Sequence, residues 1–160
     1  MLGVGYGANL GLHWAAHDPR VCTVVAIAPY NQPEQAFGRL ARVMESCISP
    51  EALQEALTLV AARLGIHWAD WSGEAALRQL KQPVLLIGGG KDTITSTNDL
   101  LALEQAAPAG SKRLLIPEAA DHKVIGYWFH EIEEPVKAWF REHLPALTDE
   151  RLEKKKTASL

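Results

Sequence analysis

Three short segments of the chain hold the residue types and the order from which chemistry can be built. Gly3-Val4-Gly5-Tyr6-Gly7 begins the chain and leads into an apolar helical stretch, Asp92 ends a glycine-rich segment, and His122 follows Ala120-Asp121. A carboxylate that orients an imidazole allows the ring to take a proton from a nucleophile. The three segments therefore suggest, in chain order, a nucleophile position, an acid and a base.

The first segment has the form of a nucleophile elbow, G-x-S-x-G, except at its centre. Such an elbow is a sharp strand-to-helix turn that exposes a serine. Here Gly5 stands at the serine position, and a residue without a side chain cannot form an acyl-enzyme. Glycine tolerates a strained backbone, so we expect the turn to persist without its nucleophile. The backbone N–H of Tyr6 is then the expected oxyanion donor.

The apolar pattern around these segments indicates an α/β fold with a mostly parallel sheet flanked by helices. Buried strands are predicted at 21–28, 83–88 and 112–116. Helices are predicted at 7–18, 96–107 and 132–144. Only Met1 and Leu2 precede Gly3, so the strand before the elbow is expected to be nearly absent. In parallel sheets function collects at the carboxyl ends of the strands, where Asp92 and His122 lie.

Residues 32–80 differ from the rest because they show no strand pattern. Helices are predicted at 33–47, 50–64 and 73–80, with Ser49 and Ser72 as N-caps. We therefore expect a helical insertion between two strands. Trp68 and Trp71 lie in it, and the alternatives for them are packing residues or the lining of a substrate pocket.

From Gly3 to about Leu144 the chain resembles the C-terminal half of an α/β-hydrolase of the serine esterase or peptidase type. The order elbow, acid, histidine is that of this superfamily. The resemblance implies that Asp92 and His122 derive from a catalytic triad and that residues 32–80 form a cap, with Trp68 and Trp71 in an acyl pocket. It predicts one truncated domain over 1–145, followed by a frayed polar tail over 146–160.

Two functions follow from this resemblance. The first is a serine acyl hydrolase lineage whose present chain is inactive, because the nucleophile and the N-terminal half are missing. The alternative is a non-catalytic pseudohydrolase that binds a small acyl substrate, another ligand or a partner. In a third possibility His122 activates water directly. The resemblance also implies strands before the elbow, so an open sheet edge is expected to favour a homo-oligomer or a complementing chain.

Composition excludes several other classes. A net charge of −3 and a pI near 6.1 predict neither nucleic-acid nor membrane binding. No apolar run is long enough to span a bilayer, and no signal peptide precedes the first motif, so a cytoplasmic protein is expected. The cysteines have no metal spacing, and Cys22 is expected to be buried in the first predicted strand.

The sequence also predicts no metal and no cofactor. His13 and His17 are four residues apart on one predicted helix, but no third ligand accompanies them, so both are expected at the helix surface. Gly3, Gly5 and Gly7 do not have the G-x-G-x-x-G spacing of a dinucleotide site. In addition, the following strand lacks the acid that binds ribose.

Overall fold

Within the part of the chain that the structure describes, the sheet has four parallel strands, and buried β-branched and leucine residues form its centre. The computed structural model describes residues 1–45 and 47–145. The strands are β1 (Leu2–Val4), β2 (Val24–Ile27), β3 (Val84–Gly89) and β4 (Lys112–Ile116), in the spatial order β1-β2-β3-β4. The predicted α/β class with a parallel sheet is confirmed, and each connection between neighbouring strands contains at least one helix.

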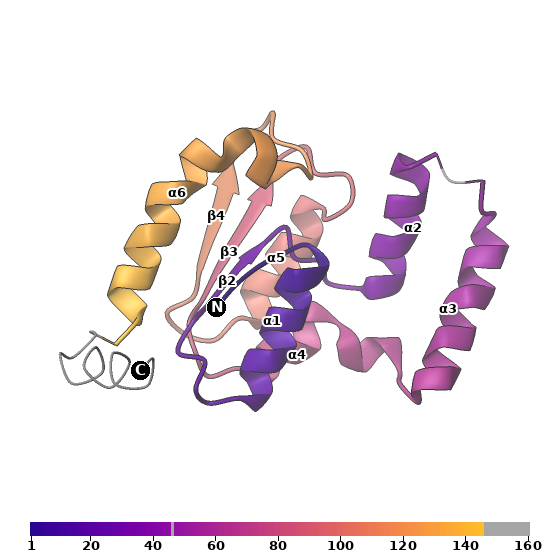
Figure 1. Cartoon of the computed structure of the whole chain (residues 1–160), viewed down its shortest axis with the longest axis horizontal. Helices are drawn as coiled ribbons and strands as arrows, with labels where there is room; N and C mark the ends of the chain where they lie inside the picture. Colours follow the sequence, from indigo (N-terminus) through magenta and orange to yellow (C-terminus); the bar gives the residue numbers. More distant parts are fainter. Residues whose placement is uncertain (46, 146–160) are drawn as a thin grey trace, which may run out of the picture.

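Helices cover both faces of this sheet (Figure 1). Those along the chain are α1 (Tyr6–His17), α2 (Pro33–Val43), α3 (Pro50–Leu64), the short 3₁₀ turn η1 (Trp68–Trp71), α4 (Gly73–Gln79), α5 (Thr97–Ala106) and α6 (Val124–His143). On one face α1, α4 and α5 pack on a core that includes Leu12, Leu86 and Leu103. On the other face α6 contributes Ile132 and Trp139. The two buried faces follow from the alternation of side chains along β2 and β3.

The strand before the elbow is present, and the expectation that it would be nearly absent is wrong. β1 pairs with β2 from Leu2 opposite Val25 to Val4 opposite Ile27. The amino group of Met1 also donates a hydrogen bond to Thr23 O at 2.8 Å. Main-chain pairing requires a neighbouring strand rather than a long apolar run, so a sequence pattern gives little sign of it.

The predicted strand at 21–28 is too long at its start. β2 begins at Val24 and Cys22 is exposed, which corrects the prediction that this cysteine is buried. Val24 is the first residue of β2 to pair with β3, opposite Val84. The apolar run in the sequence begins at Val21, three residues before the first residue that pairs with β3, so its first residues are not part of the strand.

Serine caps define the starts of three helices. Ser49 Oγ accepts a hydrogen bond from Ala52 N and Ser72 Oγ accepts one from Ala75 N, as predicted. Ser96 forms a reciprocal capping box with Asp99 at the start of α5.

α6 begins earlier than predicted, at Val124, and contains non-helical backbone at Trp128. The regular amphipathic repeat recognised in the sequence lies after that kink.

The predicted helical insertion divides into two parts in space. α4 packs against α1 and α5 and buries Leu77 in the core, whereas α2 and α3 stand off the sheet (Figure 1). Arg39 of α2 reaches back to the core: its Nη1 lies 2.5 Å from Asp99 Oδ2 on α5, and both side chains are largely buried. This ion pair ties the outer helices to the sheet domain.

We predict that Asp99→Ala lowers the free energy of unfolding by about 2–4 kcal/mol, because it removes a helix cap and leaves a partly buried guanidinium unpaired. Urea unfolding measures this change. Glu104→Ala is the control, since it removes the exposed partner of Arg113 and should cost less than about 1 kcal/mol. Equal losses in the two variants would contradict the anchoring role of Asp99.

Candidate functional site

The turn between β1 and α1 directs position 5 at a histidine. Gly5 has φ 51° and ψ −119°, a positive φ that glycine adopts without steric cost. Its N–H donates to Ile27 O at 2.8 Å, which fixes the turn on β2. A Cβ placed on Gly5 would lie 3.8 Å from His122 Nε2, with no other described atom beyond the adjacent residues within 4 Å. The space in front of the imidazole is therefore open.

Asp92 and His122 form a hydrogen-bonded pair at the carboxyl ends of β3 and β4. Nδ1 of His122 donates to Oδ2 of Asp92 at 2.9 Å. The Asp92 side chain is fully buried and that of His122 is 32% exposed. Because a carboxylate only accepts hydrogen bonds, Nδ1 carries a hydrogen, and Nε2 is the ring nitrogen that faces Gly5. The neighbouring Asp121 takes no part, since it accepts from Lys123 N.

The Asp92 carboxylate is held ionised by the residues that follow it. Ile94 N and Thr95 N donate to Oδ1 at 2.8 and 2.7 Å, and Thr95 Oγ1 donates to Oδ2 at 2.5 Å. Burial raises the pKa of Asp92, but the hydrogen bonds from His122 and Thr95 outweigh it and hold the pKa below its ordinary value. Sequence reasoning missed Thr95. The available signal was Asp92 itself, because an Asp after a glycine-rich segment commonly accepts hydrogen bonds from the backbone that follows it.

Close backbone approach brings the two halves of the pair together. A Cβ on Gly89, at the end of β3, would lie 2.4 Å from Ala120 O. The same carbonyl accepts a hydrogen bond from Lys91 N at 2.8 Å. The loop before His122 therefore crosses the end of β3 where the glycine has no side chain. Any other residue at position 89 would push this loop, and His122 with it, away from Asp92.

A cavity of about 450 Å³ lies beside α1, and we call it the cap pocket. One wall is the α1 face that includes Tyr6, Leu10 and His13. The facing wall comes from α2, α3 and η1, and includes Phe37, Val60, Leu64, Trp68 and Trp71. Gly5, Asp92 and His122 are not among its lining residues, but Tyr6, which follows Gly5, is. The cavity thus begins one residue from the elbow and extends along the helix.

His13 lies in this pocket wall, which corrects the expectation of a surface histidine. Its ring packs 5.1 Å from that of Trp71, and its Nε2 is buried without a hydrogen-bond partner among the described residues. Burial lowers the pKa of His13. His17 is exposed, and its Nδ1 lies 2.8 Å from His13 O. Within the described ranges no three His, Cys, Asp or Glu side chains gather in a possible metal site.

An asparagine clamp fixes the loop after β2 against α1. Asn9 is buried; its Nδ2 donates to Tyr30 O at 2.7 Å and its Oδ1 accepts from Tyr30 N at 3.0 Å. Both ends of the amide are therefore used within the protein. Sequence reasoning did not identify Asn9, because a polar residue on a helix is ordinarily solvated.

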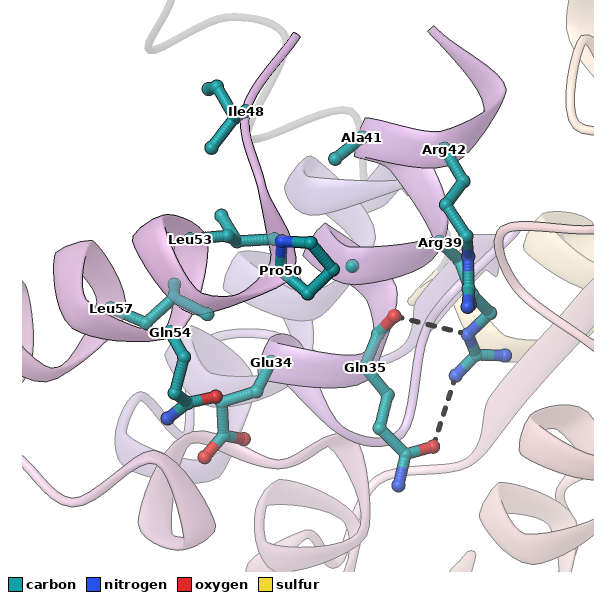
Figure 2. A pocket seen from close by; sticks show the side chains of 11 residues that line it. Glu34, Gln35, Arg39, Ala41, Arg42, Ile48, Pro50, Leu53, Gln54 and Leu57 are labelled. Atoms are coloured by element: carbon teal, nitrogen blue, oxygen red, sulfur yellow. Dashed lines mark hydrogen bonds between the residues drawn. The ribbon is translucent and has the colours of Figure 1, made fainter. Parts of the chain in front are cut away.

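A second hollow, of about 660 Å³, lies between α2 and α3. Figure 2 shows its wall, in which Arg39 lies beside Gln35 and donates to the Gln35 carbonyl at 3.2 Å. Its lining includes Glu34, Arg42 and Leu53 but no residue of the elbow or of the Asp92–His122 pair. Although larger, this hollow is separate from the groups that could do chemistry.

The fold of the chain is similar to that of solved esterases and lipases. The esterase domain of a Rhodothermus marinus protein has a TM-score of 0.65 at 20% identity, over 90% of this chain and 60% of its own. An esterase of Pyrococcus furiosus has a TM-score of 0.68 at 15% identity, over 90% of this chain and 52% of its own. The monoacylglycerol lipase of Paleococcus ferrophilus has a TM-score of 0.61 at 19% identity, over 89% of this chain and 67% of its own.

These similarities define the fold as a partial α/β-hydrolase fold, and this prediction is confirmed. The chain spans roughly half to two thirds of the length of these proteins. No family model and no curated protein matches the sequence. Among the described helices, none is both long and apolar enough to cross a membrane.

The buried His13 makes stability depend on pH. Because the folded state disfavours the protonated ring, unfolding takes up a proton, and the free energy of unfolding should decrease as the pH falls below about 6.5. Urea unfolding between pH 7.5 and 5, a range of about 2.5 units that includes the ordinary pKa of histidine, measures the slope. His13→Gln should flatten it, whereas His17→Gln, at an exposed site on the same helix, should not. Identical slopes for both variants would contradict this assignment.

Proposed function

We propose that this chain is of serine acyl hydrolase lineage and forms no acyl-enzyme. The observation that supports this most directly is the open space between Gly5 and His122 Nε2, beside an Asp92–His122 pair with the geometry of a base and its orienting acid. With no hydroxyl in that space, the imidazole has no protein nucleophile to deprotonate. The turn, the base and the acid are retained, and the attacking atom is missing.

The start of α1 provides the remaining electrostatic element of this proposal. Tyr6 is the first residue of the helix, and the first N–H groups of a helix have no partner within it. Its N–H is thus the proposed oxyanion donor next to position 5. In the third possibility, a water molecule in the open space would be the nucleophile, and His122 would take its proton as it attacks the ester. If that route operates, any ester turnover by the unaltered chain must be lost in His122→Ala.

A fluorophosphonate probe, which labels activated serines, tests the missing nucleophile. We expect no labelling of the unaltered chain and labelling of Gly5→Ser, because its Cβ would lie 3.8 Å from Nε2 and brings a hydroxyl within reach of the base. Labelling should fall by at least about 100-fold in the Gly5→Ser, His122→Ala double variant. Gly5→Ala controls for the strain of a side chain at this φ. Labelling of the unaltered chain at any serine would refute the proposal.

A second candidate function is binding without catalysis. The cap pocket supports it, because its lining does not include Gly5, Asp92 or His122 and so does not depend on the missing serine. We propose that a small acyl compound or a related molecule occupies this cavity. In this reading the chain is a pseudohydrolase whose retained pocket is its functional part.

We also propose that a second copy of the chain pairs along β1. Among the described strands only β2 neighbours β1, and the Leu2 and Val4 side chains of β1 are 47% and 40% exposed. An edge strand with apolar side chains is a template for pairing with another chain. A separate complementing chain at the same edge is the alternative occupant.

Light scattering after size-exclusion chromatography measures the molar mass of the chain in solution and so tests pairing along β1. The unaltered chain should elute as a dimer, and Val4→Lys should shift it toward the monomer, because a lysine on an edge strand opposes further pairing. Leu115→Lys is the matched control, since Leu115 is 42% exposed on β4 at the opposite edge. A monomeric unaltered chain, or a dimer disrupted only by Leu115→Lys, would rule out the β1 interface.

A further inference from the structure

Exposed apolar side chains gather in the cap pocket. Five large ones line it although each is substantially exposed: Tyr6 at 61%, Leu10 at 42%, Val60 at 42%, Leu64 at 65% and Trp71 at 40%. Single exposed apolar residues are ordinary, but a concave group of them from α1, α3 and η1 is typical of a binding site. Covering this surface is the main gain that a bound molecule would bring.

The charge of the pocket restricts what can bind there. Among the described residues that line it there is no Asp, Glu, Lys or Arg. The amide of Asn9 is already used by the Tyr30 backbone, and burial lowers the pKa of His13, which favours the neutral ring. A charged group entering this cavity would lose water without gaining a counter-ion. The walls therefore favour an uncharged molecule.

One polar side chain in the lining is buried and has a donor to offer. Tyr30 is 7% exposed, and its hydroxyl makes no hydrogen bond to another described residue. Burial, with a smaller contribution from nearby Tyr6, raises the pKa of Tyr30 to about 12. The phenol therefore keeps its hydrogen at neutral pH. A bound molecule that places an acceptor oxygen at this hydroxyl gains a hydrogen bond.

We propose that the cap pocket binds an uncharged, largely apolar molecule whose carbonyl or similar acceptor oxygen receives a hydrogen bond from Tyr30. This inference rests on the proposed binding role of the pocket and adds the chemistry of the ligand. A cavity of about 450 Å³ is at the lower end of the range for drug-sized ligands. The same walls discriminate against a carboxylate, so an intact acyl compound is preferred over the acid that its hydrolysis would release.

Three probes of similar shape separate the contributions of the apolar body, the acceptor oxygen and a negative charge to binding. Benzylacetone is an uncharged ketone, hydrocinnamate is the corresponding carboxylate, and butylbenzene has the apolar body alone. None of them can be hydrolysed, so binding is read without catalysis. Titration of the full chain, followed by the fluorescence of its tryptophans, two of which line the pocket, should give benzylacetone an affinity at least about tenfold higher than hydrocinnamate.

Three variants connect this affinity to the pocket. Tyr30→Phe should weaken benzylacetone about 3- to 10-fold and leave butylbenzene within about twofold, because only the hydrogen bond is lost. Leu64→Asp should weaken both uncharged probes, since it puts a carboxylate in the wall. Leu59→Asp is its control on the same helix, at a residue that is 57% exposed and outside the pocket lining.

Each outcome bears on a different part of the proposal. Equal affinity for ketone and carboxylate, or a Tyr30→Phe variant that binds benzylacetone unchanged, would overturn the ligand chemistry. Failure of all three probes to bind would overturn the binding role and this inference together, while the missing nucleophile is judged separately by the fluorophosphonate experiment. Equal effects of Leu64→Asp and Leu59→Asp would place the binding site elsewhere.

Discussion

The buried carboxylate of Asp92 is the interaction on which the site depends. A charge removed from water must be compensated, and here two backbone N–H groups, a threonine hydroxyl and the His122 ring provide the hydrogen bonds. These contacts fix the ring's tautomer and its direction, so that Nε2 faces the elbow. The loop that carries His122 can approach because Gly89 leaves room for Ala120 O. The geometry of the pair therefore follows from backbone packing at the end of β3.

The proposed binding site and the proposed acid–base pair are separate because different elements of the fold form them. The acid and the base lie at the ends of β3 and β4, whereas the cap pocket lies between α1 and the outer helices. Those helices are joined to the domain by the Arg39–Asp99 ion pair, and the loop after β2 is held by the Asn9 clamp. The absence of a side chain at Gly5 disturbs none of these contacts. The cavity we propose for binding is thus formed whether or not the chain makes an acyl-enzyme, which we propose it does not.

Much of the fold could be predicted because it rests on local patterns. The strand predicted at 112–116 has those bounds, the one predicted at 83–88 is shifted by one residue, and the caps at Ser49 and Ser72 are as predicted. The predictions were wrong where tertiary contacts decide whether a segment pairs or a side chain is buried. β1 exists because β2 is beside it, Cys22 is exposed because the neighbouring strand does not reach it, and His13 is half-buried because Trp71 packs over it.

The amino-acid sequence by itself determined the order of elbow, acid and histidine, and the absence of a side chain at Gly5, because these are properties of residue types and their spacing. Whether Asp92 meets His122, and whether the imidazole then faces position 5, was decided only by the tertiary structure, since residues 30 positions apart must be joined at 2.9 Å. The pocket is likewise a tertiary property. Its walls come from segments distant in the chain, and no local pattern specifies how much of a side chain its neighbours cover.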